Sequence, residues 1–277
     1  MSAEVEKPIL GRLTQGSIFT AATAEGYMGF PVWGFCITAR CDLAHDGKAQ
    51  VFNYVPIVRF EDWLLVDGGR LLIDRVAADL LNDARNCLKS IGKSSSVLDF
   101  HSVADVFQIL FPGESAKNSK NGLRFSLLVE QIAKVEKLGA EKMIARSDVA
   151  VLAEYKRPTS EKLIKELWSN KLQGYYFLDT VGETESPSSL GYVVLLREIH
   201  HLPRDVAQKI ALGIDRESPD GQGLNFSVFD FSQAVGKLRS PWVEHLMQNF
   251  ALLFSRIGLT DPLVDKYNSL CEVLNHE

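Results

Sequence analysis

Hydrophobic periodicity changes twice along this chain, and the two changes decide its fold class. Near the N-terminus, runs rich in β-branched and aromatic residues are separated by Gly, Pro and Asp, which is typical of strands. These runs are residues 16–23, 32–38 and 49–58. Strand patterns return at residues 174–181 and 190–201, on the far side of a long helical region. Strands therefore bracket helices, which predicts an α+β protein.

The helical region opens with the most regular pattern in the sequence. Residues 70–92 carry apolar side chains at intervals of four, and Gly92 provides a natural end. The apolar positions are Leu72, Val76, Leu80, Ala84 and Leu88. Further helices are predicted at residues 102–111, 121–139, 159–170 and 203–213, with a strand at 225–230, a helix at 240–258 and a shorter helix from Pro262. We therefore divide one composite domain into residues 1–68 (β), 69–171 (helical insert) and 172–277 (returning strands and C-terminal helices).

Composition places the chain among ordinary soluble proteins. Of its 277 residues, 46% are hydrophobic and 23% charged, and no apolar run approaches the roughly 20 residues that a membrane span needs. The four cysteines lack C-x-x-C spacing and the N-terminus has no apolar signal region, so we expect a cytoplasmic protein without disulfides. A net charge of −5 argues against a surface devoted to phosphate backbones and leaves a local basic groove open.

The stretch from Val32 to Asp46, "VWGFCITARCDLAHD", combines an apolar strand with a polar cluster. If the strand continues through Asp42, alternation places Cys41 in the apolar layer with Phe35 and Ile37. The opposite, polar face then carries Thr38, Arg40 and Asp42. We expect these three to bind a ligand or partner, and Cys41 to be an inert buried thiol.

A second interpretation of this stretch ends the strand at Arg40. Cys41 then enters a turn, and His45 can fold back toward the thiol. That arrangement offers either a nucleophile activated by His45 or two zinc ligands. No second ligand pair follows at a recognisable spacing, so we predict no metal site.

Histidines near the C-terminal half form further candidates. In "REIHHLPRD", strand alternation places Glu198 on the same face as His200. The two residues then form either a salt bridge at the end of the strand or a polar site. In the helix at 240–258, the side chains that lie off the apolar stripe form either a solvated face or an interaction surface. These off-stripe residues are Glu244, His245, Gln248 and Arg256.

One short pattern suggests nuclease chemistry. Asp148 and the run Glu154-Tyr155-Lys156 resemble the acidic-x-lysine core of restriction-endonuclease-like nucleases, in which two carboxylates hold a divalent metal. That interpretation needs a strand at this place. The same residues also fit a helix, so both alternatives stay open.

Two segments together resemble a group of uncharacterised bacterial proteins. "GFCITARCDLAH" and "SPWVEHLMQNFALLFSRIGL" are similar to an apolar strand ending in Cys-Asp-Leu and a C-terminal Ser-Pro-aromatic helix ending in Arg-Ile-Gly. The matching positions are Cys41, Asp42, Ser240, Pro241, His245 and Arg256. The resemblance implies a bacterial cytosolic protein of a phage-defence or other conflict locus, and it implies no reaction. The first strands also resemble the opening of the SH3-like barrel of toxin–antitoxin ribonucleases, whose basic active-site pattern is not recognisable here.

We accordingly expect an α+β fold with a small, mostly antiparallel sheet or SH3-like barrel, a large helical insert and C-terminal helices. The expected function is a protein-interaction or ligand-sensing module, because scattered polar clusters without a complete catalytic set are typical of binding proteins. A metal-dependent nuclease (Asp148, Glu154, Lys156) and a thiol-dependent enzyme (Cys41, His45) are the alternatives. The expected partner is another protein, and the sequence names no cofactor.

Overall fold

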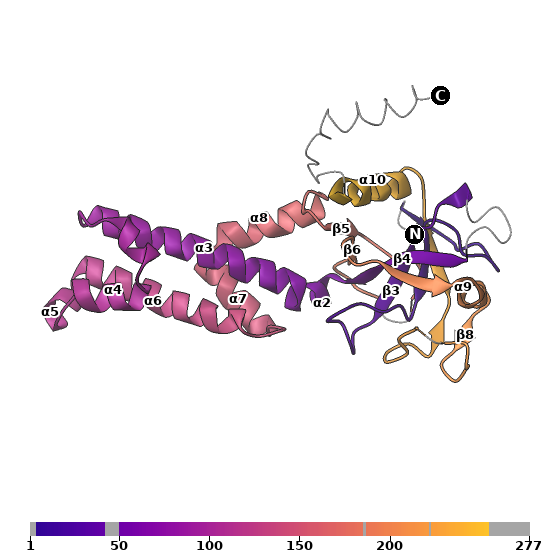
Figure 1. Cartoon of the computed structure of the whole chain (residues 1–277), viewed down its shortest axis with the longest axis horizontal. Helices are drawn as coiled ribbons and strands as arrows, with labels where there is room; N and C mark the ends of the chain where they lie inside the picture. The colour runs from indigo at the N-terminus through magenta and orange to yellow at the C-terminus, as the bar shows by residue number, and fades with distance from the viewer. Residues whose placement is uncertain (1–3, 42–49, 185–186, 222, 255–277) are drawn as a thin grey trace, which may run out of the picture.

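The computed structural model describes residues 4–41, 50–184, 187–221 and 223–254. Its fold is α+β, as predicted. A curled sheet with helices α9 and α10 forms one part, called the sheet body, and residues 60–168 project from it as a helical arm (Figure 1). No helix among the described residues has the length and hydrophobicity to cross a bilayer.

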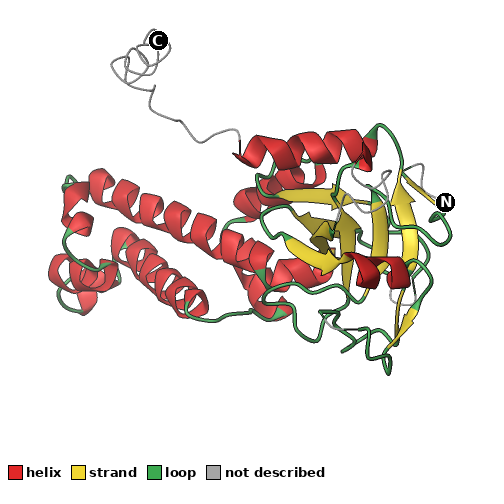
Figure 2. Cartoon of the chain, turned by 45° about the vertical axis from the view of Figure 1, so that its right-hand side comes forward, coloured by secondary structure: helices red, strands yellow, loops and turns green. Residues whose placement is uncertain are grey.

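The sheet joins strands from both ends of the chain. Its strand order is β1-β10-β2-β3-β4-β6-β5, β7 also pairs with β4, and all pairings are antiparallel. The strands are β1 (Val5–Glu6), β2 (Ser17–Thr20), β3 (Val32–Cys36), β4 (Val51–Arg59), β5 (Tyr175–Leu178), β6 (Tyr192–Leu195), β7 (His200–Pro203) and β10 (Ala234–Leu238). Because β4 pairs with both β3 and β6, the predicted single sheet is confirmed. Figure 2 shows its curl into a half-barrel, with α10 (Trp242–Phe254) along one face.

The arm contains most of the helices. They are α2 (Phe60–Leu65), α3 (Asp67–Ser90), η1 (Ser95–Asp99), α4 (Val103–Leu110), α5 (Glu114–Lys117), α6 (Lys120–Gly139), α7 (Arg146–Tyr155) and α8 (Arg157–Trp168). Helix α3 runs away from the sheet and α6 returns beside it (Figure 1). The predicted periodicity of α3 is confirmed, because all five of its predicted apolar positions are buried.

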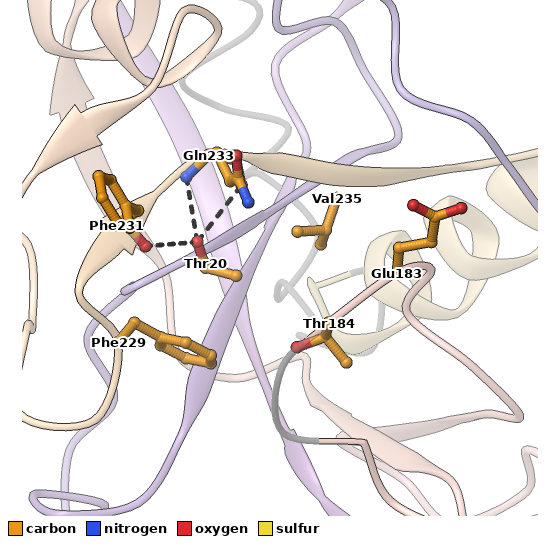
Figure 3. Close-up of a pocket in the computed structure, with 7 residues that line it drawn as sticks. All are labelled: Thr20, Glu183, Thr184, Phe229, Phe231, Gln233 and Val235. Atoms are coloured by element: carbon orange, nitrogen blue, oxygen red, sulfur yellow. Dashed lines mark hydrogen bonds between the residues drawn. The ribbon is translucent and has the colours of Figure 1, made fainter.

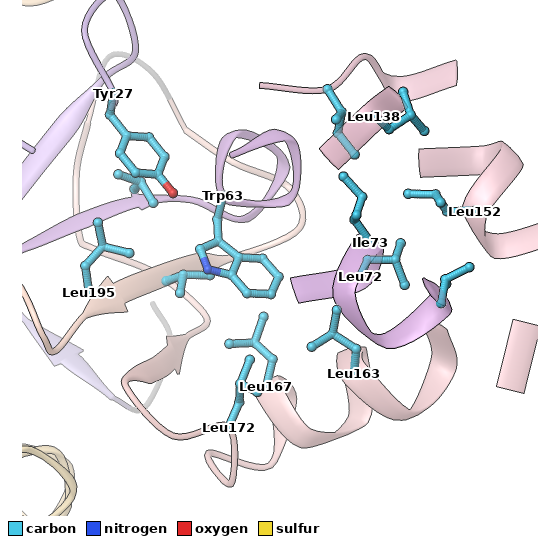
Figure 4. Packing of buried hydrophobic residues seen from close by; sticks show 14 of the residues in the cluster. Tyr27, Trp63, Leu72, Ile73, Leu138, Leu152, Leu163, Leu167, Leu172 and Leu195 are labelled. Atoms are coloured by element: carbon cyan, nitrogen blue, oxygen red, sulfur yellow. The ribbon is translucent and has the colours of Figure 1, made fainter. Parts of the chain in front are cut away.

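Two apolar cores lie on the two faces of the sheet, as strand alternation requires. One core joins Val32 and Val58 of the sheet to the base of the arm, where Trp63 of α2 is completely buried (Figure 4). The other holds Trp33 and Phe35 under α10 and the loop that carries Phe229. The arm and the sheet body therefore share one of the two cores.

The last part of the sheet was not predicted correctly. Residues 225–230 form turns rather than the predicted strand, and two strands follow them instead. These are β9 (Phe231–Ser232), which pairs with β8 (Ile214–Asp215), and β10, which lies between β1 and β2. Helix α9 (Arg204–Ile210) and α10 agree with prediction. The helix predicted from Pro262 lies outside the described residues.

Candidate functional site

Strand β3 ends at Cys36, earlier than either interpretation of the opening stretch assumed. Beyond it, the Ile37 amide still donates to the Asn53 carbonyl at 2.9 Å, but the Asn53 amide donates to the Thr38 hydroxyl at 2.7 Å instead of to a backbone carbonyl. Cys41 is exposed, so its predicted burial beside Phe35 and Ile37 is wrong. Thr38 is half-buried and Arg40 exposed, while Asp42 and His45 lie outside the described residues.

The inert buried thiol at this end of the sheet is Cys36 instead. Its exposed fraction is 2%, and burial raises the pKa of the thiol to about 11. Cys36 therefore stays protonated and unreactive at neutral pH.

Arg40 connects the end of β3 to helix α10. Its guanidinium lies 3.6 Å from the carboxylate of Glu244, and both side chains are about half exposed. Ile37 and Trp242 pack against the same apolar core. The two segments that carry the bacterial resemblance, far apart in sequence, are therefore neighbours in the fold.

His245 of α10 faces the sheet rather than solvent alone. Its Nδ1 is 2.9 Å from the Tyr176 hydroxyl of β5, and the two rings meet edge to face. Burial raises the pKa of Tyr176 to about 12, so the phenol keeps its proton and can donate to the imidazole. This contact fixes α10 on the sheet. Arg256 lies outside the described residues.

The nuclease pattern does not form the strand that it requires. Asp148 and Glu154 lie on α7, a helix. Asp148 Oδ1 is 3.2 Å from Lys134 Nζ, Lys156 pairs with Asp83, and Glu154 is exposed. Within the described residues no group of three His, Cys, Asp or Glu side chains can hold a metal ion.

The pairing predicted for Glu198 and His200 is confirmed, and it belongs to a larger arrangement. Glu198 Oε1 lies 2.5 Å from His200 Nε2 and accepts a hydrogen bond from the Glu25 amide at 2.6 Å. The other imidazole nitrogen, Nδ1, is 3.4 Å from the Thr23 hydroxyl, which is 2.8 Å from the Tyr54 hydroxyl. We call Thr23, Tyr54, Glu198 and His200 the Thr23 cluster.

Sheet pairing holds the Thr23 cluster together. Tyr54 of β4 is directly opposite His200 of β7, and their rings stack with centroids 5.3 Å apart. Tyr54 is buried, which raises the pKa of its phenol, whereas Thr23, Glu198 and His200 are partly exposed. Solvent therefore reaches part of each of these three side chains.

A second acidic group lies close to this cluster at the base of the arm. Asp67, the first residue of α3, accepts a hydrogen bond from the Tyr27 hydroxyl at 3.0 Å. Burial raises the pKa of Asp67, and the negative charge of Glu198 adds to the increase. The Thr23 cluster thus lies near the junction between arm and sheet body.

A small hollow of about 260 Å³ lies beside β10 (Figure 3). Its residues are Thr20, Glu183, Thr184, Phe229, Phe231, Gln233 and Val235. The Thr20 hydroxyl donates to the Phe231 carbonyl at 2.9 Å and accepts from the Gln233 amide at 3.0 Å. Backbone groups already occupy this hydroxyl, and the rest of the lining combines polar side chains such as Glu183 with apolar surface such as that of Phe231.

A larger, mostly apolar groove of about 480 Å³ lies on the arm. It is lined by Leu64, Leu72, Val149, Ala153, Arg157, Ser160, Glu161, Leu163, Ile164, Lys165 and Trp168, which we call the arm groove. Trp168, the last residue of α8, is 68% exposed. Such exposure is unusual for so large an apolar side chain.

Comparison of the chain with models of protein families, with curated proteins and with solved structures finds no match.

Proposed function

We propose that this chain is a protein-interaction module whose arm groove binds an apolar segment of another protein. The observation that carries the proposal is Trp168, an exposed indole at the rim of a concave apolar surface. Exposed aromatic side chains beside apolar pockets are the usual hot spots of protein interfaces. The bacterial resemblance supports a role of such a module in a phage-defence or other conflict system.

Charge around the arm groove indicates the chemistry of the partner. Arg157 pairs with Glu161 at 3.4 Å on α8. Lys165, one helical turn further along, forms no ion pair among the residues that the structure describes. A partner segment that carries a carboxylate beside its apolar side chains would complement this lysine. We therefore expect an amphipathic, acidic segment.

The experiment compares co-purification of partner proteins with the wild-type chain and two charged variants. Trp168→Glu removes the proposed anchor, and Phe100→Glu is the matched control, because Phe100 is 83% exposed and precedes α4. We expect one protein to be recovered with the wild type and with Phe100→Glu but not with Trp168→Glu. Loss of a hot-spot indole should weaken binding about 30-fold or more.

Retention of the same partner by Trp168→Glu would refute the arm groove as the binding surface. Both altered side chains are exposed, so the melting temperatures of the three proteins should agree. Loss of the partner from both variants would also contradict the proposal, because binding would then not depend on the groove.

A further inference from the structure

For a neutral His200 ring, the hydrogen bonds of the Thr23 cluster fix which atom carries each proton. Glu198 Oε1 accepts from the Glu25 amide and is 2.5 Å from His200 Nε2, so Nε2 of a neutral ring carries the proton. His200 Nδ1 is then an acceptor, and the nearby hydroxyl of Thr23 donates to it across 3.4 Å. The imidazole is oriented by a carboxylate on one side and faces a hydroxyl on the other.

Tyr54 completes this chain of hydrogen bonds. Its hydroxyl accepts from the Thr23 amide at 3.3 Å and lies 2.8 Å from Thr23 Oγ1. Because the Thr23 proton points to His200, the Tyr54 phenol is the donor to Thr23 Oγ1. A donor in this place stabilises negative charge that develops on Thr23 Oγ1 when its proton leaves.

The backbone before Thr23 adopts an uncommon conformation. Ala21, directly after β2, has φ of 60°, a left-handed value that non-glycine residues rarely take. The Ala21 carbonyl accepts from the Asn225 amide at 2.8 Å, and the Ala22 amide donates to the Val32 carbonyl at 3.1 Å. These bonds hold a sharp turn at the end of the strand, from which Thr23 reaches His200. Strained turns of this kind are concentrated at functional sites.

We propose that Thr23 is a nucleophile for acyl transfer, with His200 as its general base and Glu198 as the positioning residue. The arrangement has the three roles that hydroxyl-dependent acyl transfer requires: a nucleophile, a base in contact with it, and an acid group that orients the base. The substrate class is an activated ester or thioester. Its carbonyl approaches from solvent, to which Thr23 and His200 are partly exposed.

The reaction balances in two steps. Thr23 Oγ1 attacks the carbonyl carbon and its proton moves to His200 Nδ1; the bond to the leaving alcohol or thiol breaks, and that group takes the proton from His200. Water then attacks the acyl-threonine ester and gives its proton to His200, which returns a proton to Thr23 Oγ1 as the acid is released. No oxidant, metal or cofactor is needed.

The test is acylation of the full-length protein by 4-nitrophenyl acetate, followed by peptide mass spectrometry. We expect an acetyl group on Thr23 of the wild type. Thr23→Ser, which keeps a hydroxyl, should be acylated at the same position, and Thr23→Val, which has the same shape without one, should not. His200→Gln should slow acylation of residue 23 about 100-fold.

His201→Asn is the matched control for the base, since His201 is the next residue on β7 and is exposed. It should be acylated at Thr23 at the wild-type rate. Absence of acetyl from Thr23 in the wild type would overturn the proposal, and so would an unchanged rate in His200→Gln. Equal melting temperatures of Thr23→Ser and Thr23→Val exclude misfolding as the cause of a difference between them. The test does not involve Trp168, so its result is independent of the proposed protein interaction.

Discussion

The helical arm and the sheet body are built from contacts of different range. In the arm, Ser119 caps its own helix through the Gly122 amide, and Lys134 pairs with Asp148 only 14 residues away. In the sheet body, the Ser232 hydroxyl donates to the Thr20 carbonyl at 2.7 Å, across 212 residues. Each helix of the arm therefore forms from its own local hydrogen bonds, although contacts such as Lys156 with Asp83 then join distant helices. The strands of the sheet body form only through pairing with distant segments.

This difference explains which elements were predictable. The period of α3 was visible in sequence because each helix carries its own hydrogen bonds and one apolar stripe. Strand β10 was missed, since "AVGKL" has little strand pattern and is defined by its neighbours β1 and β2. The segment at 225–230 has more strand-like residues but joins no strand ladder, although the Asn225 amide donates to the Ala21 carbonyl.

The candidate sites were predictable to the same extent: contacts within one short segment could be inferred from sequence, and contacts between distant segments could not. Glu198 and His200 could be paired from sequence because they lie two residues apart, although Glu198 lies in the loop before β7 rather than on the strand assumed for both. Thr23 and Tyr54 come from other strands or loops, and no sequence pattern relates them to His200. The error at Cys41 arose because the pairing with β4 ends near Ile37: the Ile37 amide still bonds to Asn53, but the Asn53 amide bonds to the Thr38 side chain instead of to backbone.

Replacing one buried phenylalanine in each part should give the largest difference in stability between the arm and the sheet body. Phe125 of α6 is fully buried and packs against Phe107 and Phe111, and Phe35 is fully buried under α10. Each change to Ala should cost about 3–5 kcal/mol of unfolding free energy. Hydrogen exchange should show that Phe125→Ala loses protection mainly in the arm. Phe35→Ala should lose it throughout, because strand β3, which carries Phe35, also contributes Val32 to the core that the arm shares. Equal loss in both regions of Phe125→Ala would show that the arm does not open separately.

Thiol labelling compares the two parts without mutation. Cys41 is exposed, whereas Cys36 in the sheet body and Cys87 in α3 are buried. With a disulfide reagent at neutral pH and peptide mapping, Cys41 should react at least about 100-fold faster than Cys36. Cys87 should fall between them, because locally packed regions open more readily than the sheet. Reaction of Cys36 as fast as Cys41 would contradict the burial of β3.

Acidity should affect the junction between the two parts through Asp67. Burial raises the pKa of Asp67 above 3.8, so the folded protein binds this proton more tightly than the unfolded chain does. The protonated carboxyl therefore contributes stability that is complete below pH 3.8 and is lost as pH rises through the raised pKa. Asp67→Asn imitates the protonated form. The unfolding free energy of Asp67→Asn should increase relative to that of the wild type as pH rises to neutrality. Denaturant titration at each pH measures both values.

The opposite pH trend in Asp67→Asn would show that the negative charge of Asp67 is favourable in the folded state. Such an outcome would follow from the partial positive charge at the N-terminus of α3, which favours a negative side chain there.

The smallest effect concerns exposed ion pairs, one in each part. Arg40 and Glu244 join β3 to α10 across 3.6 Å, and Arg157 and Glu161 lie 3.4 Å apart on α8. All four side chains are about half exposed or more, so water screens both pairs and each should contribute about 0.5 kcal/mol or less. Double-mutant cycles with Ala, read from denaturant unfolding at low and high salt, measure the two coupling energies. A coupling above about 1 kcal/mol for Arg40 and Glu244 alone would mean that this pair is shielded from water in solution.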